Sequence, residues 1–257
     1  MGLRDSAPKT TASEKVGFVF SPAWTRSLSK LSGTAYTLAN LTVASVVLVV
    51  ALEWVVRGSL QDVGTFISSS ARPGMTTIAA VLALLVALDS ILGRRYLSLI
   101  AVAPLCALVG LISAQKQTYL SDPLYPSDLL FGRQILELLP TMLKAQPFTA
   151  MLVGLGLSAA IASLAALWLL AHRHSPVLRW RERAAGLALA LPLLASLASL
   201  MDYSHYSWVR DRLNIIPMMW DQQENYRHNG FLMAFAFNIP MANVSAPEGY
   251  GENSIAD

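Results

Sequence analysis

The chain has 257 residues, of which 54% are hydrophobic and only 14% charged, and its formal net charge is +3. A mean hydropathy of +0.48 excludes an ordinary soluble domain and indicates a polytopic membrane protein. The sequence pI of about 9.1 would suggest nucleic-acid binding in a soluble chain, but here the basic residues cluster at the edges of apolar runs. In that position they orient helices in a bilayer, so we expect membrane lipid and no nucleic acid as a partner.

Residues 1–34 predict a cytoplasmic N-terminal tail. They hold five basic residues and no apolar core of signal-peptide length, so the first apolar run should act as the anchor. Five runs then approach the ~20 mostly apolar residues that a crossing helix needs. We predict an all-α membrane protein with five transmembrane helices between residues 35 and 200, plus interfacial amphipathic helices. The runs cover residues 35–56, 75–92, 96–112, 148–171 and 184–200.

The distribution of basic residues predicts the orientation of these spans. The N-terminal tail, Arg94, Arg95 and the loop of residues 172–183 hold eleven of the nineteen Lys and Arg residues, and they fall on one side of the membrane. Short loops rich in Lys and Arg stay in the cytoplasm. The N-terminus is therefore predicted inside and the C-terminus outside. The second and third runs are short, which leaves a re-entrant pair as the alternative.

The outer loop of residues 113–147 separates the third run from the fourth. Two prolines break the chain there, Ser127 can cap a helix, and Asp128 suits a helix N-terminus, where negative charge is stabilised. From Asp128 to Leu139, apolar and polar side chains fall largely on opposite sides of a helical wheel. This pattern predicts a helix lying in the membrane interface.

Residues 201–257 predict an extracytoplasmic interfacial segment followed by a linker. Asn229 and Gly230 break the chain before an apolar stretch at residues 231–237, which is too short to span a bilayer. We expect this stretch to be half-buried in the interface. Residues 246–252 have the composition of a linker that leaves the membrane.

Candidate binding residues lie at the predicted outer surface. Glu53 and Arg57 are four residues apart, in the favourable order for an ion pair, and could hold a lipid headgroup, although a structural pair at the helix end is the simpler interpretation. Lys116, Asp128 and Arg133 surround the turns of the outer loop and could line a headgroup site; the alternative is a solvated loop surface.

The remaining polar residues predict little chemistry within the chain. Asp89 lies shortly before Arg94 and Arg95 and is predicted to pair with them. The single cysteine, Cys106, excludes an internal disulfide and a multi-cysteine metal site. We find no ligand-spaced metal cluster and no catalytic constellation, so we assign neither catalytic nor metal-binding residues.

Three segments carry a resemblance to the lipoteichoic acid synthase and phosphoglycerol transferase family. They are the outer loop at residues 116–133, with PSDLL at 126–130; the stretch NYRHNGFL at 225–232; and PEGY at 247–250. The predicted layout of five spans, with the N-terminus inside and the C-terminus outside, also resembles the membrane half of that family. Members continue into a sulfatase-like domain with a nucleophilic threonine and a divalent metal.

The resemblance implies a membrane anchor and lipid-presenting domain of a phosphoglycerol transferase in a bacterial cytoplasmic (inner) membrane. The catalytic sulfatase-like domain would be absent from this chain and act in cis or in trans, so the chain alone should be inactive. The expected lipid is an anionic phospholipid such as phosphatidylglycerol, and the divalent metal would belong to the missing domain. The alternative is a self-sufficient small integral membrane protein, such as a transporter component or an assembly partner of a cell-envelope enzyme.

Overall fold

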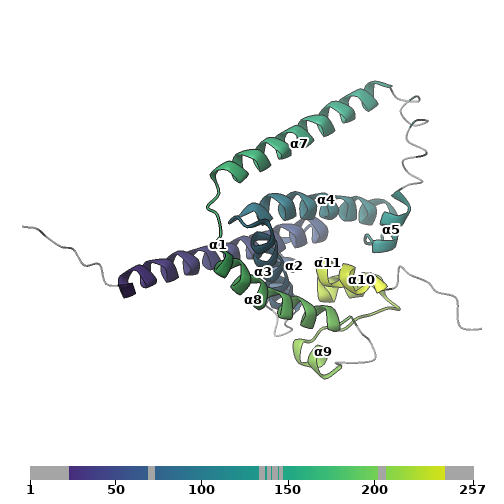
Figure 1. The fold of residues 1–257 in the computed structure, drawn as a ribbon. Helices are drawn as coiled ribbons and strands as arrows, with labels where there is room; N and C mark the ends of the chain where they lie inside the picture. The colour runs from purple at the N-terminus through teal and green to yellow at the C-terminus, as the bar shows by residue number, and fades with distance from the viewer. Residues whose placement is uncertain are drawn as a thin grey trace, which may run out of the picture. The chain divides into compact units, whose positions relative to one another are not determined.

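The computed structural model describes residues 23–68, 73–132, 147–201 and 207–240, together with the single positions 137, 140 and 144. This part of the chain forms α-helices and contains no β-strand (Figure 1). Residue contacts divide the chain into two compact units, Met1–Leu38 and Ala39–Asp257. The packing described below is that of the second unit.

The described part of the chain combines long, predominantly apolar helices with short helices of five to nine residues. They are α1 (Ala23–Arg57), α2 (Leu60–Ser68), α3 (Pro73–Leu92), α4 (Leu97–Leu120), α5 (Pro126–Leu130), α7 (Pro147–His174), α8 (Trp180–Ser199), α9 (Ser207–Leu213), α10 (Gln222–Asn229) and α11 (Phe231–Phe237).

Four helices of the described part are long and apolar enough to cross a membrane: residues Ala35–Arg57 of α1, and α3, α4 and α8. They coincide with four of the five predicted runs, so the all-α class is confirmed and the prediction of a membrane-embedded chain is supported. The remaining run, the fourth in chain order at residues 148–171, lies within α7, a continuous helix of 28 residues. Helix α4 extends eight residues past the predicted end at residue 112, because its final turns contain good helix formers such as Gln and Lys.

Helix α3 packs against α2, α4 and α8. Its contact with α8 is close because the facing residues are small: Ala83 and Ala87 pack on Ala190. A Cβ at Gly186 of α8 would lie only 2.2 Å from the Oγ of Ser90. Small residues at helix crossings are how membrane helices approach each other. On its other side, α3 contributes to a core formed by Leu41, Val49, Phe66, Ile78, Val81, Leu85 and Val102.

Asp89 caps the N-terminus of α4. Its carboxylate accepts hydrogen bonds from the backbone N–H groups of Tyr96, at 2.6 Å, and Ser98, at 2.8 Å. The predicted pairing of Asp89 with Arg94 and Arg95 is therefore wrong, because exposed backbone donors at a helix start lie closer to the carboxylate. Arg95 instead pairs with Glu182 of α8 at 3.1 Å. Helices α3 and α4 are each long enough to cross alone, which favours two spans over a re-entrant pair.

The outer loop contains a short helix that begins one residue before the predicted cap, Ser127. Helix α5 starts at Pro126, and the carboxylate of Asp128 accepts from the backbone N–H of Tyr125 at 2.7 Å. Asp128 therefore supports the helix N-terminus, as predicted, while Ser127 lies inside the helix and is not its cap. The predicted amphipathic continuation to Leu139 lies mostly outside the described residues.

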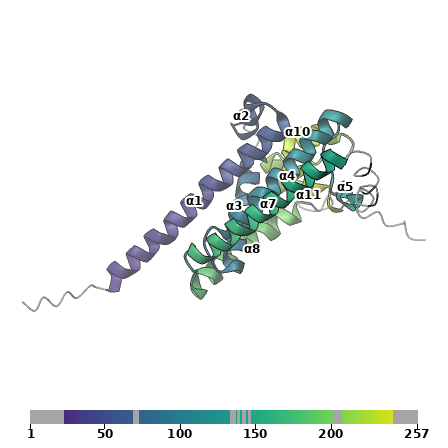
Figure 2. The same ribbon diagram turned by 90° about the horizontal axis from the view of Figure 1, so that it is seen from above.

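The apolar stretch 231–237 forms α11 and is buried in protein. Phe231, Ala234 and Phe237 are each at most 1% exposed. The stretch is more buried in protein than predicted, because α11 packs between the ends of α1 and α8 and a neighbouring short helix, α10. Its position at the membrane interface stays a prediction. Figure 2 shows α10 and α11 beside the bundle formed by the long helices. Gly230, with φ of 81°, makes the sharp turn that separates α10 from α11.

Candidate functional site

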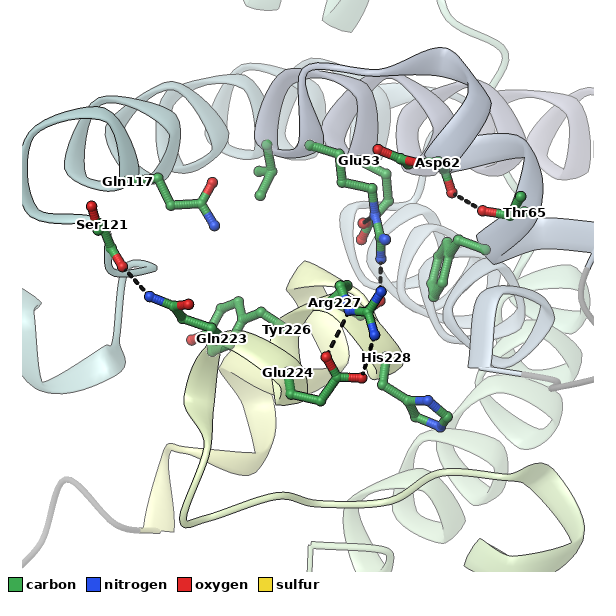
Figure 3. A pocket seen from close by; sticks show the side chains of 13 residues that line it. Glu53, Asp62, Thr65, Gln117, Ser121, Gln223, Glu224, Tyr226, Arg227 and His228 are labelled. Atoms are coloured by element: carbon green, nitrogen blue, oxygen red, sulfur yellow. Dashed lines mark hydrogen bonds and ion pairs between the residues drawn. The ribbon is translucent and has the colours of Figure 1, made fainter.

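A polar cavity of about 790 Å³ lies where the Arg57 end of α1, α2, the end of α4 and α10 meet (Figure 3). Its volume falls within the roughly 300–1,000 Å³ typical of small-molecule sites. Eleven of its thirteen lining residues carry polar side chains, although three of its helices are predominantly apolar elsewhere. The lining residues are Glu53, Val56, Arg57, Asp62, Thr65, Phe66, Gln117, Ser121, Gln223, Glu224, Tyr226, Arg227 and His228.

Glu53 lies at the inner wall of the cavity and is 1% exposed. Its carboxylate forms an ion pair with Arg57 at 2.7 Å and accepts a hydrogen bond from the backbone N–H of Phe231 at 2.6 Å. A buried carboxylate is costly unless it is paired and hydrogen-bonded, and here both conditions are met. The second partner satisfies the first orphan N–H of α11. Glu53 therefore joins the end of α1 to the start of α11.

Arg57 extends the same junction to α10. Its guanidinium donates to the backbone carbonyl of Arg227 at 2.9 Å and lies 4.6 Å from the centre of the Phe66 ring. The cation therefore has an acid, a carbonyl and an aromatic face as partners. Arginine suits this position because its planar guanidinium can satisfy several partners at once.

Gly230 permits the close approach of α10 and α11 to this pair. A Cβ at this position would lie 2.5 Å from Cζ of Phe66 and 2.8 Å from Oε1 of Glu53. Both distances are shorter than van der Waals contact, and the positive φ independently favours glycine. The sequence break predicted at this glycine is confirmed, and its physical reason is the packing against Glu53 and Phe66.

Glu224 and Arg227 form a second ion pair at the rim of the cavity. The Nε and Nη2 atoms of Arg227 lie 2.6 and 2.9 Å from the two carboxylate oxygens, in a bidentate arrangement. The hydrogen bond from Arg227 holds the pKa of Glu224 below its ordinary value. The Arg227 side chain is 74% exposed, so the pair contributes little to stability.

A separate polar cluster occupies the outer loop. The ammonium of Lys116 lies 2.7 Å from Asp128 and 3.3 Å from Asp122, and 4.2 Å from the centre of the Tyr125 ring. Tyr125 donates its hydroxyl to Asp122. Burial and the hydrogen bond to Asp122 raise the pKa of Tyr125 above its ordinary value. The cluster folds the loop back onto the end of α4.

The loop cluster is connected to the cavity through Tyr226. The Tyr226 hydroxyl donates to the backbone carbonyl of Leu124 at 2.6 Å, and its ring packs edge-on against Tyr125 and Phe231. At the rim, Gln223 of α10 donates to the backbone carbonyl of Ser121 at the end of α4. Helix α10 thus contacts both the outer loop and the α1–α2 corner.

The structure groups the predicted site residues into two places. Glu53 and Arg57 line the cavity, whereas Lys116 and Asp128 belong to the loop cluster; Arg133 lies outside the described residues. Sequence reasoning missed the contribution of α10, whose residues Gln223, Glu224, Arg227 and His228 complete the cavity. A signal was present in the sequence, because DQQENYRHN at 221–229 is a run of polar side chains directly before an apolar helix.

Within the described residues, no group of three or more His, Cys, Asp or Glu side chains is arranged to hold a metal ion. The divalent metal that the family resemblance implies therefore has no fitting site there. We assign no step of group transfer to these residues.

Comparison with known proteins identifies one long match. A curated protein of Rhizobium meliloti (strain 1021), named "Putative cyclic beta-1,2-glucan modification protein", is 45% identical over 255 residues. The match covers 99% of this chain and 39% of the relative, so the chain spans about two fifths of that protein's length. No family model and no solved structure matches the chain.

Proposed function

We propose that the chain is the membrane-embedded part of a cell-envelope enzyme that modifies a glucan with glycerophosphate taken from a phosphatidylglycerol-like lipid. The observation that carries this proposal is the 45% identity to the Rhizobium meliloti relative along 99% of the chain. We take the acceptor, a cyclic β-1,2-glucan, from the name of that relative. The resemblance of residues 116–133, 225–232 and 247–250 to phosphoglycerol transferases supplies the reaction class.

In this proposal the chain crosses a bacterial cytoplasmic membrane five times, with α7 as the fourth span in chain order, in addition to α1, α3, α4 and α8. Its N-terminus is in the cytoplasm and its C-terminus outside, as the Lys and Arg distribution predicts. A sulfatase-like domain with a divalent metal acts beside it, in cis or in trans. The membrane part presents the lipid, and the other domain performs the transfer.

The packing of the tail supports such a role. A reaction on a lipid headgroup needs its active site held at a fixed height above the bilayer, since correct positioning supplies much of the rate of an enzymatic step. Helices α10 and α11 are held to the end of α1 by Glu53 and Arg57 and to the outer loop by Tyr226. Such a fixed junction limits the position from which the following residues leave the bundle.

The lipid headgroup would contact the residues that frame this surface. Lys116, Asp128 and Arg133 of the outer loop are the candidates for this contact, whereas Glu53 and Arg57 pair with each other beside the cavity. A basic side chain near an anionic membrane surface contributes about 1 kcal/mol to attraction.

Release of diacylglycerol tests the proposed function. The complete protein that contains this chain is reconstituted in phosphatidylglycerol vesicles with manganese or magnesium, with and without cyclic β-1,2-glucan. We expect metal-dependent release that the glucan accelerates, and no release from residues 1–257 alone. Absence of release from folded complete protein would overturn the proposal. Release by residues 1–257 that one acid-to-amide change abolishes would make this chain an enzyme by itself.

A further inference from the structure

The cationic groups of the cavity are already engaged by the protein. Arg57 is bound by Glu53 and the Arg227 carbonyl, and Arg227 is bound by both carboxylate oxygens of Glu224. The lining holds three carboxylates, on Glu53, Asp62 and Glu224, against two guanidiniums. A phosphate would meet an excess of negative charge and would have to break one of these pairs. The cavity is therefore poorly suited to an anion.

Other polar side chains in the lining make no hydrogen bond to the protein within the described residues, although the charge of Asp62 acts on Arg227. Among the described residues, the carboxylate of Asp62 and the side-chain amide of Gln117 make no hydrogen bond, and the Gln117 amide extends toward the cavity in Figure 3. The side-chain oxygen of Gln223 is also uncommitted, since that residue contacts Ser121 through its Nε2. These groups offer hydrogen-bond acceptors as well as donors. A ligand that satisfies them must itself both donate and accept.

Hydroxyl groups have this property, because each supplies one donor and two acceptor lone pairs. We propose that the cavity bounded by Asp62, Gln117, Gln223 and the two ion pairs binds an uncharged, hydroxyl-rich sugar segment of the glucan. The preference for neutral hydroxyls follows from the cavity itself, while the choice of a glucan rests on the proposed function. The cavity thus binds the glucan that accepts glycerophosphate, and it is distinct from the candidate lipid-headgroup site on the outer loop.

The location of the cavity suits this role. It is formed by the same contacts that fix α10 to the bundle, so a sugar bound there is held next to the junction from which the tail continues. Arg57 and Glu53 serve as positioning residues, because their charges are used within the protein. Asp62 and Gln117 are the groups that would contact the sugar.

Binding of unmodified cyclic β-1,2-glucan to the complete protein in nanodiscs tests the proposal. The double variant Asp62→Ala, Gln117→Ala removes two side chains that make no hydrogen bond within the described residues, so its melting temperature should match that of the wild type. We expect its glucan affinity, measured by saturation-transfer NMR titration, to fall at least tenfold. The matched control is Asp211→Ala, an exposed carboxylate outside the cavity, which should bind glucan as the wild type does.

Competition distinguishes the ligand classes. Glycerol phosphate and short-chain phosphatidylglycerol should not displace the glucan, and raising the salt concentration should not weaken its binding. Displacement by either anion, or equal glucan affinity in the wild type and a folded double variant, would overturn the proposal. The diacylglycerol assay reports separately on the proposed function. A raised KM for glucan with unchanged kcat in the double variant supports both the glucan site and the proposed function. Glucan binding by the wild type without any lipid cleavage would contradict the proposed function alone.

Discussion

Glu53 connects two helices, α1 and α11, although it belongs to an apolar helix. Its carboxylate pairs with Arg57 and accepts from the N–H of Phe231, 178 positions away in sequence. The i,i+4 pair was predictable from spacing, because residues four apart share a helix face. The second partner, the backbone N–H of Phe231, was not predictable, since a backbone N–H carries no signal in the sequence. The simpler interpretation of a structural pair describes only half of what this residue does.

Removing the charge of Glu53 should release the tail from the bundle. Glu53→Gln preserves the shape of the side chain but leaves the guanidinium of Arg57 without its acid in a largely buried position. Breaking one partner of a buried pair costs about 3–5 kcal/mol, so we expect a lower melting temperature in detergent. Trypsin should also cleave faster at Arg227, which α10 presents beside the pair.

The exposed pair at the rim provides the matched control. Glu224→Gln removes a carboxylate from the same helix corner, but an exposed pair contributes only about 0–1 kcal/mol, so the melting temperature should hardly change. Equal effects of Glu53→Gln and Glu224→Gln would contradict the assignment of Glu53 as the junction between α1 and α11.

At the scale of elements, α10 and α11 depend on the turn at Gly230. Its φ of 81° and ψ of 163° lie in a region that is almost restricted to glycine, at a cost of about 1–3 kcal/mol for other residues. Gly230→Ala should therefore destabilise the docked tail, and the close contacts with Phe66 and Glu53 add to the effect. Gly64→Ala on α2, where a Cβ meets no atom within 4 Å, should be neutral or slightly stabilising. Equal melting temperatures of the two variants would exclude this account of the turn.

Hydropathy predicted the long helices well but could not place α11. Apolar runs of about 20 residues in a chain of this composition have few alternatives to crossing helices. The seven residues 231–237 are equally compatible with an interface or with a protein core, and only the tertiary contacts with Leu52, Val56 and Leu200 show how far the protein itself buries them. The partners of Asp89 were predicted wrongly for a similar reason. In the sequence, a carboxylate that caps a helix cannot be distinguished from one that pairs with a nearby arginine, because the difference lies in the backbone geometry.

At the scale of the whole molecule, the orientation in the membrane rests on the basic residues of the loops. In a chain with Cys106→Ala, a cysteine at Asn253 should react with an impermeant thiol reagent applied to intact cells. A cysteine at Ser175, between α7 and α8, should react only after the membrane is opened. Labelling of the Ser175 position alone from outside would reverse the assignment.

The most direct measurement is the mass of the glucan after reaction. The complete protein is incubated with cyclic β-1,2-glucan, divalent metal and phosphatidylglycerol that carries isotope-labelled headgroup glycerol. The proposed function predicts glucan that has gained labelled glycerophosphate, with an equal amount of diacylglycerol left in the vesicles. Glucan that stays unmodified, or that gains a group without the label, would contradict it.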